Sequence, residues 1–364
     1  MLEYKIAVTQ LPFVGDANGK KLIAYCGGVE AVFRESKKNL LKIPGLPRKV
    51  IDSIRNSKAV FERVEKEIRF IEDNGIRPLF FLDDDYPQRL KNCADGPMML
   101  YYKGTAGLNA ARVVSVVGTR TPTNYGKAVC EKMIATLKEA GVLVISGLAY
   151  GIDICAHRNS LKNDITTVGV LGSGMDKIYP AANKNTAMEM MENGGILTEF
   201  LSGTEPERQN FPQRNRIVAG MADVTVVVES GQKGGSMITA GLAFDYNRDV
   251  AAFPGRAGDK LSRGCNSLIK RNIASLIESG DDLLKLMNWE KSLEKKNPVQ
   301  RSFFVEMNET EKVLYNLLKD GKKHNIDMLS IESGLPMSKT SASLLSLEFK
   351  GVVQSLPGKS YKLL

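Results

Sequence analysis

Residues 112–157 read RVVSVVGTRTPTNYGKAVCEKMIATLKEAGVLVISGLAYGIDICAH, and this stretch decides the fold of the chain. The β-branched run at 113–117 is typical of a strand that is covered on both faces, and Gly118 ends it with a turn. A helix-like segment, a second apolar run and a second glycine turn follow. This order of strand, helix and strand predicts a parallel sheet.

Arg120 lies in the turn that follows the first of these strands. In open α/β sheets the carboxyl ends of the strands face the amino ends of the next helices, and ligands collect there. Exposed backbone N–H groups at such helix starts favour anions. A cationic side chain at this place indicates a phosphate ligand.

Strands and helices keep alternating from residue 166 to residue 253, which predicts a doubly wound sheet. The chain has 364 residues, 43% of them hydrophobic, and this length is enough for two or three domains with a sizeable core. We expect a helical domain at 1–75, the sheet domain at 76–288, a linker at 289–307 and a winged helix at 308–364.

The two terminal domains leave their roles open. The turn at 43–47, IPGLP, looks like the glycine hairpin of small helical DNA-binding modules, although a plain helical packing module explains it as well. In the expected winged helix, the third helix, SKTSASLLSLEFKG at 338–351, offers only Lys339 and Lys350 as cations. Contact with a protein therefore competes there with DNA binding.

Charge and cysteine content narrow the class of protein. The 50 Lys and Arg outnumber the 41 Asp and Glu, which gives a net charge of +9. This charge favours a polyanionic partner such as nucleic acid, but taken alone it is a weak indication. The five cysteines form no CxxC pair, so we expect neither disulfides nor a structural zinc. The first ten residues lack the pattern of a secretion signal, and no apolar run approaches a membrane span of ~18 residues. We expect a cytoplasmic protein that contacts no membrane.

Residues 208–216, RQNFPQRNR, contain three arginines and one aromatic residue but no acid. Cations spaced along a backbone and aromatic faces that stack bases are what single-stranded nucleic acid requires. The alternative is structural, because Asn215 and Arg216 could cap the following helix and pair with Glu199 or Glu229. Binding is the interpretation we favour.

The loop GQKGGSMITA at 231–240 precedes a helix and supplies N–H groups, hydroxyls and Lys233, which suits a phosphate. It is neither a Walker A loop nor a dinucleotide fingerprint, so neither ATP nor NAD is indicated. Asp153 and His157 lie one helical turn apart and could form an acid–base pair with Ser146 or Ser236 as nucleophile. With no third partner in the pattern, we favour a helix cap and a structural hydrogen bond.

Seven ordered motifs then resemble the DNA-processing protein A (DprA/Smf) family. They are VGTRTPTNYG at 117–126, SGLAYGIDICAH at 146–157, GVLGSGMDKIYPAAN at 169–183, GGILTEF at 194–200, FPQRNRIVAG at 211–220, GGSMITAGLA at 234–243 and AAFPGRAGDKLSRGCNSLI at 251–269. The resemblance covers about residues 75–285 tightly. The terminal domains agree only loosely with the accessory domains of the family.

The resemblance implies an extended Rossmann fold without a nucleotide cofactor, flanked by a small helical domain of the SAM or helix-hairpin-helix kind and by a winged helix. It implies a homodimer that binds single-stranded DNA in a basic pocket, protects incoming DNA and loads the RecA recombinase onto it during natural transformation. No catalytic residue and no metal are implied. The DNA-binding residues expected from the motifs and the residue patterns together are Gly118, Thr119, Arg120, Lys184, Arg208, Phe211, Arg214, Asn215, Arg216, Lys233, Gly235 and Ser236.

Two departures and one competing class accompany this expectation. Many relatives carry lysine where this chain has Ala181, and serine where it has Thr119. The competing class is a phosphoribohydrolase-like enzyme of the same superfamily, in which Arg120, Glu199, Glu229 and the loop at 231–236 would act on a nucleotide. The PGGxGTxxE signature of such enzymes is missing. A transcription factor acting through residues 309–364 is a third, weaker possibility.

Overall fold

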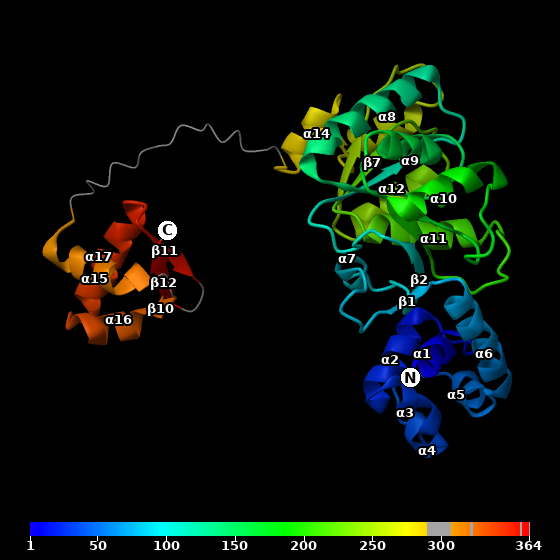
Figure 1. Cartoon of the computed structure of the whole chain (residues 1–364), viewed down its shortest axis with the longest axis horizontal. Helices are drawn as coiled ribbons and strands as arrows, with labels where there is room; N and C mark the ends of the chain where they lie inside the picture. The colour runs from blue at the N-terminus through cyan, green and yellow to red at the C-terminus, as the bar shows by residue number, and fades with distance from the viewer. Residues whose placement is uncertain (290–306, 321–322, 357–358, 364) are drawn as a thin grey trace. The chain divides into compact units, whose positions relative to one another are not determined.

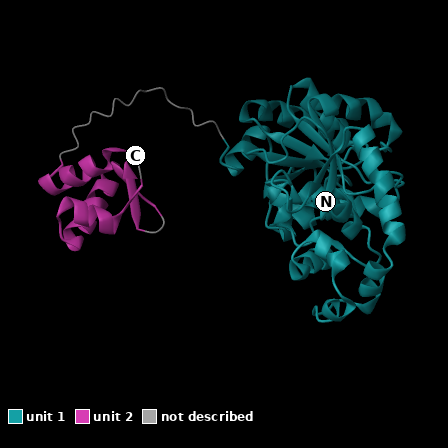
Figure 2. Cartoon of the chain, turned by 60° about the horizontal axis from the view of Figure 1, so that its bottom comes forward, with its two compact units in different colours: residues 1–291 teal, residues 292–364 magenta. Residues whose placement is uncertain are grey.

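The computed structural model describes residues 1–289, 307–320, 323–356 and 359–363. The chain forms two compact units, Met1–Lys291 and Ser292–Leu364 (Figure 2). Most of the linker expected at 289–307 lies outside the described residues. The expected domain boundaries stay predictions.

The first unit is built on one sheet, which in the described residues has nine strands in the order β1-β2-β6-β5-β4-β3-β7-β8-β9 (Figure 1). Strands β3 to β9 pair in parallel, while β1–β2 and β2–β6 are antiparallel. The strands are β1 Arg77–Phe80, β2 Met99–Gly104, β3 Val113–Val117, β4 Leu143–Ser146, β5 Thr167–Val170, β6 Gly194–Thr198, β7 Val224–Val227, β8 Asp249–Ala252 and β9 Ser275–Leu276. The predicted parallel, doubly wound sheet is confirmed.

The direction of winding reverses at β3. From β3 the chain proceeds through β4 and β5 to β6 on one side, and β7, β8 and β9 then follow on the other side of β3. The loops after β3 and β7 therefore diverge to opposite faces of the sheet. In open α/β sheets the crevice at such a switch point is the expected place for a ligand.

The strand at 113–117 is buried on both faces, as its β-branched run predicts. Val113 and Val117 pack against one layer of helices, and Val114 and Val116 pack against the other. The first layer contains α11 Asn210–Gly220, α12 Gly235–Asp245 and α13 Arg263–Lys270. The second layer contains α8 Asn124–Leu137, α9 Ile152–Lys162 and α14 Gly280–Leu286. Helix α10 Lys184–Glu192 packs beside α9, and the short helix α7 Gln88–Lys91 packs beside α11 of the first layer.

The N-terminal segment is helical, as predicted. Its helices are α1 Leu2–Thr9, α2 Asp16–Cys26, α3 Val29–Arg34, α4 Lys37–Leu40, α5 Arg48–Arg55 and α6 Lys58–Asp73. Ile6, Leu22 and Val50 from these helices share one apolar core with Met99 and Ile196 of the sheet. Because this core is continuous, the helical segment and the sheet belong to one compact unit.

The second unit is a winged helix. Its helices are α15 Glu309–Leu317, α16 Ile326–Ser333 and α17 Met337–Phe349, and its strands β10 His324–Asn325, β11 Val353–Leu356 and β12 Ser360–Leu363 form a small sheet in the order β10-β12-β11. Of the two cations predicted for the third helix, Lys350 follows the end of α17 and pairs with the buried Glu311 at 2.7 Å. Lys339 is exposed. The turn residues 357–358 lie outside the described part of the chain.

Among the described residues, no helix has the length and apolar character needed to cross a membrane.

Candidate functional site

A cavity of about 1170 Å³ opens at the carboxyl ends of β3, β4 and β7. We call it the strand-end cavity. It is lined by the turn after β3, the loop after β4, the segment that enters α11, and the loop that enters α12. Of the predicted residues, Gly118, Thr119, Arg120, Arg208, Phe211, Arg214, Asn215, Lys233, Gly235 and Ser236 line it. The loops that flank the switch point in the sheet order thus bring together residues more than 100 positions apart.

Helix α11 forms one wall of the cavity. The segment 208–216 does not merely precede a helix, because α11 already begins at Asn210. Pro212 is tolerated in this first turn, where its missing N–H needs no intrahelical acceptor. Phe211, Arg214 and Asn215 then share one face at i, i+3 and i+4, and this face borders the cavity.

Phe211 and Arg120 form a half-exposed platform inside the cavity. The guanidinium carbon of Arg120 lies 5.6 Å from the centre of the Phe211 ring, within the range of a cation–π contact. The ring of Tyr179 lies 5.8 Å from that of Phe211, tilted by 41°. Arg120 is exposed and forms no ion pair among the described residues. One charged and two aromatic faces are therefore available to a ligand.

Arg214 is held differently, at the floor of the cavity. Only 5% of the residue is exposed, and its Nη1 donates to the carbonyl oxygen of Val170 at 2.7 Å. Its buried Nε has no partner in the described part of the chain. Gly147 makes room for it, since a Cβ there would lie 1.8 Å from Nη1. Burial lowers the pKa of Arg214, with the Asp153 carboxylate acting in the opposite direction.

Two predicted residues lie apart from the strand-end cavity. Lys184 is exposed at the first position of α10 but is not among the residues that line the cavity. Arg216 is 7% exposed, forms ion pairs with Glu199 and Asp16, and donates to the carbonyl oxygen of Asp95. The structural alternative, pairing with Glu199, thus describes Arg216, and its predicted role in DNA binding is not supported.

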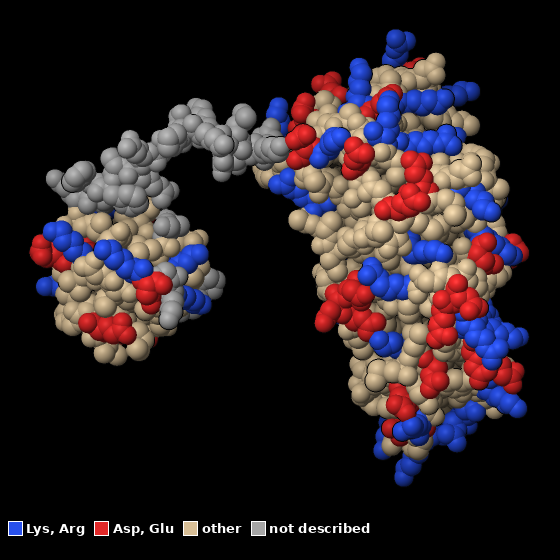
Figure 3. Space-filling model, viewed as in Figure 1, with Lys and Arg blue, Asp and Glu red and all other residues tan. Residues whose placement is uncertain are grey.

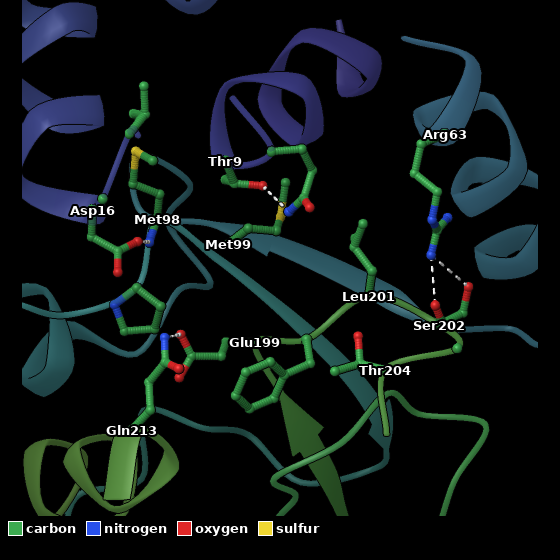
Figure 4. A pocket seen from close by; sticks show the side chains of 16 residues that line it. Thr9, Asp16, Arg63, Met98, Met99, Glu199, Leu201, Ser202, Thr204 and Gln213 are labelled. Carbon is green, nitrogen blue, oxygen red and sulfur yellow. Dashed lines mark hydrogen bonds between the residues drawn. The ribbon is translucent and has the colours of Figure 1, made fainter. Parts of the chain in front are cut away.

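Both acidic partners of Arg216, Glu199 and Asp16, line a second cavity of about 640 Å³, which we call the helix–sheet cavity (Figure 4). It lies between the N-terminal helices and the sheet, and its walls include Asp16, Arg63, Met99, Glu199 and Gln213. Glu199 is 8% exposed in its side chain, and one of its oxygens has no partner among the described residues. Burial raises the pKa of Glu199 to about 7, while Arg216 acts to lower it.

The acid–base pair suggested by the sequence is not assembled. His157 Nδ1 lies 2.7 Å from Thr167 Oγ1, and burial lowers the pKa of His157 to about 3, so its ring stays neutral. The structural hydrogen bond predicted for His157 is confirmed. Ser146 donates to the carbonyl oxygen of Val116, and Ser236 bonds Ser230. In the described residues, neither serine hydroxyl is hydrogen-bonded to His157, whose Nδ1 bonds Thr167 instead.

Both acids of the competing enzyme hypothesis have structural partners. Glu229 is 6% exposed, and its two oxygens accept from the backbone N–H and the hydroxyl of Thr123, each at 2.8 Å. This contact fixes the turn that carries Arg120. Glu199 is paired with Arg216. Neither carboxylate lines the strand-end cavity.

Tyr150 and Tyr179 also belong to the site, although neither was predicted from the sequence. They are 48% and 45% exposed and, with Arg120, Phe211 and Arg214, enclose a recess of the strand-end cavity. Tyr150 lies in the motif SGLAYG at 146–151 and Tyr179 in KIYP at 177–180. An aromatic residue inside a glycine-rich turn is a usable signal, but only the fold shows that the two turns converge.

Comparison with known proteins identifies the chain. Residues 77–288 match the family model described as DNA recombination-mediator protein A. The chain belongs to this family. Residues 309–359 also match the DprA winged helix domain.

Relatives cover most of the chain. The Smf protein of Synechocystis is 35% identical over 77% of this chain and 71% of its own length. The DNA processing protein DprA of Streptococcus pneumoniae is 41% identical over 56% of this chain and 71% of its own length.

Solved structures of relatives are similar in fold. The structure of DprA from Streptococcus pneumoniae has a TM-score of 0.64 at 32% identity, covering 78% of this chain and 98% of that one. The structure of DNA processing protein A from Helicobacter pylori, described for its single-stranded DNA binding mode, has a TM-score of 0.54 at 29% identity, covering 58% of this chain and 95% of that one.

Proposed function

We propose that this protein binds single-stranded DNA in the strand-end cavity. The observation that carries the proposal is the Arg120–Phe211 platform, where a guanidinium without an ion pair among the described residues lies over a half-exposed ring at the sheet's switch point. Arg120 and Arg208 supply charge for phosphates, and Phe211 and Tyr179 supply faces for bases. The Helicobacter pylori relative described for its single-stranded DNA binding supports this assignment.

The remaining cavity residues would complete the interface. The loop at 231–236 offers backbone N–H groups and Lys233 at the start of α12, a place that suits a phosphate. Arg214 would contact the ligand from the floor, because its buried Nε lacks a partner among the described residues. Duplex DNA should bind the platform less well, since its paired bases cannot turn onto the rings. Lys184 and Arg216 are left out of the interface.

Because the chain belongs to this family, we also infer its role in the cell. We infer a homodimer, not an enzyme, that protects incoming DNA in the cytoplasm and loads RecA recombinase onto it during natural transformation. Two linked cavities would strengthen binding through a high effective concentration. The engagement of Glu199 and Glu229 in structural contacts argues against the phosphoribohydrolase alternative. RecA binding to a single-stranded oligonucleotide, measured with and without the protein, tests the loading role.

The experiment for the cavity measures affinity for a labelled single-stranded oligonucleotide across a range of salt. Phe211→Ala should lose about 1–3 kcal/mol of binding free energy, the usual worth of a stacked base. Arg120→Ala should weaken binding and reduce the log–log salt slope by about 0.7. Lys132→Ala, on the exposed face of α8, is the control of equal charge change. Wild-type affinity in both Phe211→Ala and Arg120→Ala would rule the cavity out.

A further inference from the structure

One stretch of the N-terminal helical segment, residues 34–58, is strongly basic. Residues 34–58 contain eight Lys or Arg and two Asp or Glu, so this stretch of 25 residues carries +6 of the total of +9. The strand-end cavity lies elsewhere, among residues 117–261. The protein therefore has a second concentration of positive charge, separate from the strand-end cavity.

The structure leaves this charge on the surface. Six of the eight cations are exposed and form no ion pair among the described residues; they are Lys38, Lys42, Arg48, Lys49, Arg55 and Lys58. We call them the basic N-terminal surface. Asp52 pairs with Lys37 at 3.0 Å, and Glu35 accepts from the Ser36 N–H and the Asn39 amide. Figure 3 shows Lys and Arg side chains projecting from the end of the unit where α3, α4 and α5 lie in Figure 1.

The turn between α4 and α5 gives this surface a fixed shape. Leu46 N–H donates to the Ile43 carbonyl at 3.3 Å, and Gly45 between them adopts a φ of +70°, as a Pro-Gly turn requires. Pro44 and Gly45 are exposed, whereas Ile43 is buried and anchors the turn. Lys21 from α2 donates to the Pro44 carbonyl and ties the turn to the rest of the segment.

The turn also presents a hydrogen-bond donor between the cations. The Gly45 N–H has no acceptor within the described residues, and it belongs to an exposed turn. Lys42 lies just before the turn, and Arg48 and Lys49 begin α5 just after it. A free N–H with flanking cations matches a phosphate oxygen, whose charge and lone pairs it satisfies together.

We propose that the basic N-terminal surface is a second DNA-binding site, which holds the phosphate backbone and reads no bases. Its contacts require phosphates alone, whereas the strand-end cavity requires unpaired bases. The second site should therefore accept duplex as well as single-stranded DNA. It does not depend on the proposed function of the cavity, since either site could exist without the other.

The test uses the full-length protein and a short blunt-ended duplex, with a single strand of the same length as a second probe. In the variant Lys42→Ala/Arg48→Ala/Lys49→Ala, duplex affinity should fall roughly tenfold or more, and the log–log salt slope should decrease by about 0.9 for each phosphate that is no longer neutralised. The same variant should also bind the single strand more weakly than the wild type, because the surface holds the phosphate backbone of either form.

The control variant, Lys132→Ala/Lys138→Ala/Lys162→Ala, removes the same charge from exposed positions of α8, α9 and the short helical turn that follows α8. It should change duplex affinity less than about twofold, as expected for charges remote from the bound DNA. A second variant, Lys42→Gln/Arg48→Gln/Lys49→Gln, removes the same charge but keeps a polar side chain at each position, so that a loss of binding can be separated from a loss of fold. The proposal is overturned if the wild type does not bind duplex, if the 42/48/49 variants bind it normally, or if the control variant is weakened as much.

Discussion

The two sides of helix α11 place arginines in opposite surroundings. Toward the strand-end cavity, Arg214 and the nearby Arg120 meet aromatic rings and backbone, with no ion pair to either among the described residues. On the other side, Arg216 forms ion pairs with Glu199 and Asp16, which line the helix–sheet cavity. The two positions are only two residues apart in the motif RNR. An arginine in a basic run is thus a ligand contact or a structural ion-pair partner according to which face of the helix it occupies.

The largest effect is expected for the substitution Arg216→Ala, which removes the structural ion pairs of α11. In Arg216→Ala, the buried Glu199 and its neighbour Asp16 lose their shared cation, so we expect the free energy of unfolding to fall by about 3–5 kcal/mol. Chemical denaturation measures this decrease. Protein that remains folded should bind single-stranded DNA with wild-type affinity. Stability within about 0.5 kcal/mol of wild type would show that Arg216 is not the structural partner that its burial indicates.

A second prediction concerns the buried histidine beneath the strand ends. Burial lowers the pKa of His157 from 6.5 to about 3. Between these values the unfolded chain binds a proton that the folded chain does not. The contribution of His157 to the free energy of unfolding is therefore fully present above pH 6.5. As the pH falls from 6.5 toward 3, it decreases by about 1.4 kcal/mol for each pH unit.

The check compares wild type and His157→Gln by denaturant unfolding between about pH 5 and 6.5, above the range where ordinary carboxyl groups titrate. The wild type should lose stability more steeply than the variant as the pH falls. Parallel curves would mean that His157 is protonated in the folded protein, and that it has an acidic partner which the structure does not place beside it.

The smallest effect is expected for single cations at the boundary of the proposed DNA interface. Arg208 lines the strand-end cavity and Lys184 does not, although the sequence assigned DNA binding to both. Arg208→Ala should reduce the log–log salt slope for single-stranded DNA by about 0.7, and Lys184→Ala should leave it unchanged. Equal effects would show that the bound strand extends beyond the cavity as far as α10.

Much of the fold could be predicted because its signal is local. The β-branched run at 113–117 and the glycine turn after it specify a buried parallel strand, and the structure has β3 there. The basic run at 208–216 was expected to precede a helix, but helix α11 already begins inside it, at Asn210. Proline at position 212 reads as a helix breaker in sequence, yet the first turn of a helix tolerates it. Because most of this run is helical, Arg214 and Arg216 lie on different faces of α11.

The sequence by itself determined the family, the parallel sheet, the winged helix and the strand end at which Arg120 lies, since period, turn residues and motif order are properties of neighbouring residues. Only the tertiary structure decided which cations are free. It buried Arg216 between Glu199 and Asp16, brought Tyr150 and Tyr179 around Phe211, and left Lys184 outside the cavity. The physical reason is that a charge is neutralised by whatever lies within a few ångströms, and those neighbours come from distant parts of the chain.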